Sequence, residues 1–157
     1  MASALYYEKG VGVAADAAAA VAMYTRAAEA GSLGAQLNLG VCYRDGKGVA
    51  VDAAAAVKWF TRAADVGDAY AMNSLATCYD KGAGVAVDFA KAIALYTRAA
   101  EAGYAAAQCC LGARYLEGGR GVARDVAKAR ELLSRSAAGG VSLAAEMLAA
   151  LDAAAPP

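Results

Sequence analysis

Four cysteines, Cys42, Cys78, Cys109 and Cys110, are the residues of this 157-residue chain best suited to metal binding or nucleophilic chemistry. No two of them have the C-x-x-C spacing, and the chain has no histidine to complete a zinc site or to act as a general base. Adjacent cysteines on one helix also point about 100° apart, which disfavours a bond between Cys109 and Cys110. We therefore expect buried reduced thiols, with no metal, no cofactor and no catalytic residue.

Glycine pairs such as Gly46-x-Gly48 resemble part of a phosphate-binding loop. A phosphate loop follows a strand and usually carries Gly-Lys-Ser or Gly-Lys-Thr, and neither feature is present here. The pairs lie instead between two segments with helical character, so we interpret them as turns.

Composition excludes several classes of protein. Hydrophobic residues make up 60% of the chain, much of it alanine, and there are only two prolines, both at the end. This favours an all-α protein, because alanine is the best helix former and proline the worst. Fifteen basic and fifteen acidic residues give zero net charge, so no nucleic-acid partner is expected. No uninterrupted apolar stretch is long enough to span a membrane, and no membrane partner is expected.

An internal repeat of 36 residues runs through the chain. The segment Tyr43–Asp52 recurs as Tyr79–Asp88. Residues 7–16 form an earlier copy, and residues 115–125 form a later copy with one extra residue. A second block returns at 24–31, 60–67 and 96–103, and more loosely at 133–140. A fixed period of this length is typical of a stacked repeat architecture.

Each period predicts two helices, one over residues 32–45 and one from Asp52 to Gly67. The Asp52 carboxylate is placed to accept backbone N–H bonds as an N-cap, and the glycines end both helices. We predict a single all-α domain over 1–157, a right-handed α-α superhelix of about four 36-residue helix-turn-helix repeats. The predicted periods are 1–31, 32–67, 68–103 and 104–140, followed by a capping helix over 141–154 and a tail over 155–157.

These recurring residues resemble the Sel-1-like repeat family, a relative of the tetratricopeptide repeats. The pattern in one copy is Ala35-x3-Leu39-Gly40-x2-Tyr43-x2-Gly46-x-Gly48-Val49-x2-Asp52-x3-Ala56-x2-Trp59-Phe60-x-Arg62-Ala63-Ala64-x2-Gly67. The lysine usual after the capping aspartate is kept as Lys91 and Lys128 but is alanine at Ala19 and Ala55. The resemblance implies an adaptor that holds other proteins, with the first helices lining a concave groove.

Comparison of the copies separates the packing face of the first helix from the rest. Ala35, Leu39 and Tyr43 are repeated in each copy and fall on one side, where a small residue such as Gly40 admits the partner helix. The opposite side varies, as a binding groove would. Its predicted partner-binding residues are Leu37, Val41, Arg44, Tyr70, Asn73, Thr77, Asp80 and Leu116. On this interpretation Asp80→Ala is nearly silent for stability.

The predicted function is a non-catalytic scaffold that binds a partner protein or peptide. Two alternatives stay open: an enzyme acting on β-lactam-like cell-wall compounds, as the resemblance allows, and a self-assembling structural module. The expected state is a monomer, with weak self-association left open. Unpaired cysteines and the lack of a secretory pattern in residues 1–9 predict a cytoplasmic location.

Overall fold

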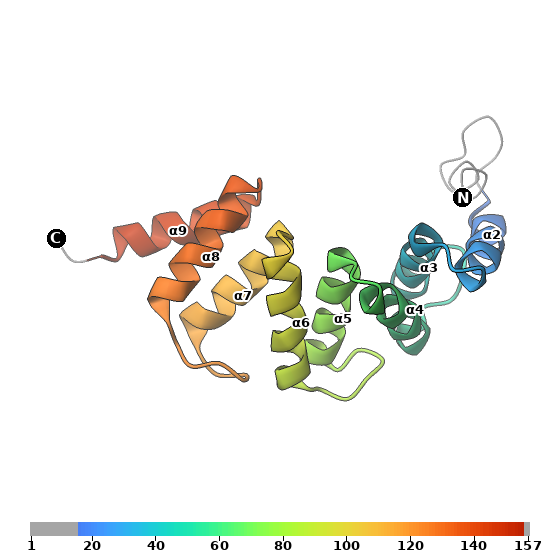
Figure 1. Cartoon of the computed structure of the whole chain (residues 1–157), viewed down its shortest axis with the longest axis horizontal. Helices are drawn as coiled ribbons and strands as arrows, with labels where there is room; N and C mark the ends of the chain where they lie inside the picture. The colour runs from blue at the N-terminus through green and yellow to red at the C-terminus, as the bar shows by residue number, and fades with distance from the viewer. Residues whose placement is uncertain (1–15, 156–157) are drawn as a thin grey trace.

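The computed structural model describes residues 16–155, and over this range the chain forms eight α-helices and no β-strand (Figure 1). The helices are α2 (Ala17–Glu29), α3 (Leu33–Asp45), α4 (Ala53–Asp65), α5 (Ala69–Lys81), α6 (Phe89–Glu101), α7 (Ala105–Glu117), α8 (Val126–Ala138) and α9 (Ser142–Ala153). They follow one another in a row, with α2 and α9 at opposite ends (Figure 1). None of them is both long and apolar enough to cross a lipid bilayer.

The row is a stack of helix pairs. Helices α3, α5 and α7 each pack against the second helix of their own pair, which is α4, α6 or α8, and against the second helix of the pair before. The all-α solenoid predicted from the repeats is therefore confirmed. Helix α2 is the second helix of the first repeat, and the first helix predicted for that repeat lies in residues outside the described range. The predicted capping helix is α9, which begins after Val141 and ends before Ala154.

Aspartates cap the second helices as predicted. The backbone N–H of Ala55 donates to Asp52 Oδ1 at 2.9 Å, and Asp16, Asp88 and Asp125 accept the equivalent bond at 3.0 Å. An N-cap carboxylate satisfies a helix N–H that has no partner within the helix and opposes the positive end of the helix dipole. The four capping bonds thus fix where the second helix of each repeat begins.

The second glycine of each turn is required by contact as well as by conformation. Gly84 has φ +73°, and a Cβ added there would lie 2.4 Å from the carbonyl carbon of Ala53. A Cβ added at Gly48 would collide with the Ala17 backbone in the same way. Only a residue without a side chain permits both the positive φ and this close approach of backbone to backbone. Each turn thereby rests on the beginning of the second helix of the preceding pair.

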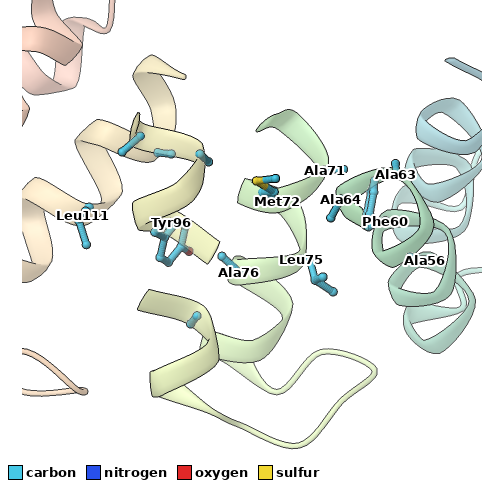
Figure 2. Packing of buried hydrophobic residues seen from close by; sticks show 14 of the residues in the cluster. Ala56, Phe60, Ala63, Ala64, Ala71, Met72, Leu75, Ala76, Tyr96 and Leu111 are labelled. Atoms are coloured by element: carbon cyan, nitrogen blue, oxygen red, sulfur yellow. The ribbon is translucent and has the colours of Figure 1, made fainter. Parts of the chain in front are cut away.

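Small residues on the first helices admit bulky partners from the second helices. A Cβ at Gly40 would lie 2.6 Å from the Phe60 ring, and a Cβ at Gly112 would lie 2.9 Å from Leu133. Figure 2 shows the central cluster, in which Phe60 and Ala64 on one side face the α5 residues Met72 and Leu75. Farther along the same cluster come Ala76, Tyr96 and Leu111. The predicted packing face of the first helix is therefore confirmed for its alanine, leucine and small residue.

The repeated tyrosines are less buried than the sequence indicated. Tyr79 and Tyr115 are half-buried, and the ammonium groups of Lys91 and Lys128 lie 5.2 and 4.8 Å from their ring centres. A lysine over a ring face contributes a modest cation–π attraction. In these two repeats the lysine after the capping aspartate therefore covers the tyrosine of its own repeat. Tyr43 has no such lysine, because the equivalent residue of its repeat is Ala55.

Candidate functional site

Two adjoining hollows lie along the first helices α3, α5 and α7. The first, of about 310 Å³, is lined by Arg44, Tyr70, Asn73, Ser74, Thr77, Cys78, Lys81 and Ala83. The second, of about 430 Å³, is lined by Thr77, Asp80, Lys81, Tyr96, Cys110, Ala113, Arg114, Glu117 and Arg120. Thr77 and Lys81 line both. We call the combined lining the groove surface.

Aromatic rings and a guanidinium build the rim of the first hollow. Arg44 Nη1 donates to Tyr70 Oη at 3.3 Å, and the Tyr70 ring meets Phe60 and Tyr104 edge to face, with ring centres 6.3 and 6.2 Å apart. Arg44 also donates from Nε and Nη2 to the Asp45 carboxylate at 2.7 and 3.1 Å. This pairing raises the pKa of Arg44 and lowers the pKa of the Asp45 carboxyl. The hydrogen bond from Arg44 and the contacts with the Phe60 and Tyr104 rings therefore hold the Tyr70 side chain in place.

Polar side chains form the floor of the first hollow. Thr77 Oγ1 lies 3.0 Å from both the Asn73 carbonyl oxygen and Tyr96 Oη, which ties α5 to α6. Asn73 Oδ1 is buried and accepts no hydrogen bond from any residue in the part of the chain that the structure describes. A buried acceptor without a donor costs free energy, so it is an exception that calls for an explanation.

An ion pair joins α5 and α7 at the second hollow. The Arg114 guanidinium is bonded to the Asp80 carboxylate, and these side chains are only 13% and 9% exposed. Arg120 Nη1 lies 4.0 Å from the same carboxylate, and its guanidinium carbon lies 5.8 Å from the Phe89 ring centre. Asp80 therefore has two basic neighbours from a different repeat. The ion pair argues against the sequence-based expectation that Asp80→Ala is nearly silent for stability.

The thiols that line the hollows are poorly suited to catalysis. Burial raises the pKa of Cys78 in the first hollow and of Cys110 in the second. A nucleophilic or metal-binding cysteine needs a lowered pKa, because the thiolate is the reactive form. Over residues 16–155, no three side chains of the histidine, cysteine or carboxylate type come together as metal ligands would.

The structure gathers five of the eight predicted binding residues on the groove surface: Arg44, Tyr70, Asn73, Thr77 and Asp80. Leu37 and Val41 are half-buried instead and pack against the central cluster shared with α5. Leu116 packs against the C-terminal cluster around Leu133 and Ala144. These three leucine and valine side chains serve stacking, because a first helix in a solenoid contacts neighbours on two sides rather than one.

Sequence reasoning missed several groove residues. Lys81 and Arg114 occupy positions whose chemistry differs between copies, and that difference would have found them. Tyr96 occupies an aromatic position that recurs as Tyr24 and Phe60, so the sequence gives no such signal for it. Arg120 lies in the last glycine turn, which is one residue longer than its copies. It has φ +48°, and the residues around it, Gly119 and Val122, form an isolated β-bridge. That insertion was visible in the sequence and would have pointed to Arg120.

The helix pairs and the groove along their first helices define a protein of the α-solenoid class. The chain belongs to the Sel1 repeat family, because the family model described as Sel1 repeat matches residues 1–32, 34–68, 69–104 and 105–141. Sel1 repeats generally act as protein–protein interaction scaffolds and are generally non-catalytic. Among curated proteins, no relative matches the chain.

Solved structures resemble this one, and three of them show the range of similarity. A Sel1 repeat protein from Oxalobacter formigenes is 36% identical with a TM-score of 0.87, over 94% of this chain and 60% of that one. A protective antigen present in uropathogenic Escherichia coli strains is 32% identical with a TM-score of 0.54, over 94% of this chain and 39% of that one. Cysteine-rich protein B from Helicobacter pylori is 20% identical with a TM-score of 0.66, over 88% of this chain and 99% of that one, and shares the fold. The chain thus spans less than two thirds of the length of the first two.

Proposed function

We propose that this chain is a non-catalytic adaptor that binds one extended or helical segment of a partner protein along the groove surface. The observation that carries the proposal is the adjoining pair of hollows on neighbouring first helices, lined by side chains that differ between repeats. Residues that serve stacking recur at the repeat period, whereas most of the lining residues do not; the exceptions include Cys78 and Tyr96, which recur as Cys42 and Tyr24. The scaffold role general to Sel1 repeats supports the same conclusion.

The side chains that line the first hollow are suited to binding a peptide. Tyrosine and arginine are among the residues most enriched at binding hot spots, and Tyr70 and Arg44 stand together at its rim. Asn73 lines the hollow and its buried amide oxygen is without a donor among the described residues, so turning this amide into the hollow would let it accept the backbone N–H of a partner segment. The raised pKa values of Cys78 and Cys110 support the non-catalytic part of the proposal. A cytoplasmic location stays a prediction of the sequence.

The test is capture of partners by the full chain, mapping of the bound segment on peptide arrays, and affinity measurement with groove variants. Arg44→Ala and Tyr70→Phe are expected to weaken binding about tenfold, which corresponds to about 1.4 kcal/mol. Tyr70→Phe keeps the ring contacts with Phe60 and Tyr104 and removes only the hydroxyl, so the fold is preserved.

Lys58→Ala is the matched control, because Lys58 is exposed on α4 outside the groove surface. Loss of capture with Lys58→Ala, together with parent-like binding by Arg44→Ala and Tyr70→Phe, would place recognition on the second helices and overturn the proposal.

A further inference from the structure

The first hollow has an uneven distribution of charge. Arg44 and Lys81 are its charged lining residues, and both are basic. Arg44 is already paired with Asp45, which lies outside the lining. Lys81 is exposed and forms no ion pair with any residue of the described range. Because it also lines the second hollow, its ammonium stands unpaired where the two hollows meet.

Neighbouring acidic groups do not neutralise Lys81. Asp80 is committed to Arg114 and has Arg120 as a second neighbour, so its carboxylate has two basic partners already. Glu117 lines the second hollow together with Lys81, but the two side chains form no ion pair in the described part of the chain. An unpaired ammonium on a concave surface favours a ligand of opposite charge, since electrostatic complementarity sets specificity and steers encounter.

A second, independent observation lies in the same hollow. Asn73 Oδ1 is buried there and accepts no bond from the described residues. An N–H donor supplied by a ligand would satisfy this oxygen once the Asn73 amide turns into the hollow that the residue lines. A peptide segment that carries a carboxylate offers both groups within one or two residues, namely the backbone N–H and the negative charge.

We infer that the segment bound by the groove surface is acidic: an aspartate or glutamate of the partner lies against Lys81 while a nearby backbone N–H donates to Asn73 Oδ1. This inference rests on the proposed function and names the chemistry of the partner.

The test starts from a phage-displayed random-peptide library selected on the full chain. Selected sequences are expected to be enriched in aspartate and glutamate. In fluorescence anisotropy with the synthetic peptides, replacing the key acid by its amide is expected to weaken binding to the parent about tenfold and to leave binding to Lys81→Met unchanged. Lys81→Glu is expected to bind a peptide in which that acid is replaced by lysine better than it binds the selected peptide. Lys58→Met, outside the groove, serves as the matched control and behaves as the parent.

N-methylated peptides test whether Asn73 accepts a hydrogen bond from the peptide backbone. N-methylation of the selected peptide, one residue at a time, is expected to reveal one position at which the parent loses about tenfold in affinity and at which Asn73→Ala loses nothing further. A uniform response of both proteins to N-methylation would overturn the role of Asn73.

The outcomes separate the two proposals. Neutral or basic selected peptides whose binding is lost in Arg44→Ala and Tyr70→Phe would overturn the acidic segment and leave the adaptor function standing. Peptides insensitive to every groove variant, or no selected peptide at all, would overturn both.

Discussion

The carboxylate of Asp80 on α5 is bonded to the guanidinium of Arg114 on α7, and the pair joins two repeats at a point largely withdrawn from solvent. Removal of Asp80 leaves the Arg114 guanidinium without its partner in a partly buried position, and removal of Arg114 leaves the Asp80 carboxylate with only Arg120, at 4.0 Å, among the described residues. We expect Asp80→Ala and Arg114→Ala each to lower the free energy of unfolding by about 1–3 kcal/mol. Urea unfolding followed by circular dichroism measures both.

The double variant separates pairing from desolvation. If the two side chains act as a unit, Asp80→Ala with Arg114→Ala destabilises by less than the sum of the single changes. Strict additivity would show that the pair contributes nothing to the coupling between α5 and α7.

This pair also shows what the sequence could and could not predict. The repeat framework was readable, because Asp52, Gly84 and Gly40 recur with the same role in each copy and each role follows from helix capping, turn geometry or close packing. Asp80 and Arg114 do not recur: their equivalents one period away are Leu116 and Cys78. A contact between residues that are not equivalent in different copies leaves no signal at the repeat period. For that reason the sequence predicts a nearly silent Asp80→Ala, whereas the ion pair predicts a loss of stability.

The structure places the polar residues of the predicted groove on the groove surface and packs its apolar residues in the hydrophobic clusters. A helical wheel assigns Leu37 and Val41 to the side opposite the packing face, yet both pack against the central cluster. The wheel treats a helix as having one buried side, whereas stacking buries a second side against the next repeat. Single-helix periodicity therefore cannot separate a groove residue from a residue between repeats.

Gly84→Ala is expected to destabilise more than Gly103→Ala. Both glycines have positive φ, +73° and +87°, so both substitutions carry the same backbone strain. A Cβ at Gly103 has no atom within 4 Å, whereas one at Gly84 collides with the Ala53 backbone. The difference in free energy of unfolding is expected to be about 1–3 kcal/mol, the usual cost of overpacking. Equal urea midpoints for the two variants would show that the turn can move away from α4 freely.

Tyr104 precedes helix α7 and contacts an aromatic ring instead of capping the helix. Ser32 and Asp68, its equivalents, accept bonds from the N–H groups of Ala35 and Ala71, but Tyr104 makes no side-chain cap and meets the Tyr70 ring instead. Tyr104→Asp and Tyr104→Ala lose the same ring contact, and only the aspartate restores a cap. Thermal unfolding is therefore expected to show Tyr104→Asp more stable than Tyr104→Ala by about 1 kcal/mol. An aspartate variant no more stable than the alanine variant would mean that the beginning of α7 cannot adopt the capped geometry.

Stability is expected to fall at alkaline pH through the buried thiols. Burial raises the pKa of Cys78, Cys109 and Cys110 above the ordinary value of 9.0. Below that value both folded and unfolded thiols are protonated, and the stability is fully present. As the pH rises further, the unfolded thiols ionise first, so the free energy of unfolding falls. Urea titrations at pH 7 and in the alkaline range check this, and Cys110→Ala is expected to reduce the slope; an unchanged slope would assign the effect to other groups.

The buried side-chain oxygen of Asn73 lacks a hydrogen-bond donor among the described residues. The equivalent residue one repeat earlier is Leu37, a half-buried side chain that packs against the central cluster, so leucine is known to fit this repeat position. Asn73→Leu removes the unsatisfied acceptor and adds apolar contact. We expect it to raise the free energy of unfolding by about 1–2 kcal/mol, measured by urea unfolding.

The same substitution is expected to weaken binding of a partner peptide, because it removes the acceptor for the backbone N–H. A residue that costs stability and supports binding is the usual signature of a functional site. Thr77→Val, which removes the hydroxyl contact with Tyr96 at 3.0 Å, is the matched control and is expected to lower stability. If Asn73→Leu destabilises the free protein instead, its amide is satisfied within the fold, and the reason for assigning it to ligand binding disappears.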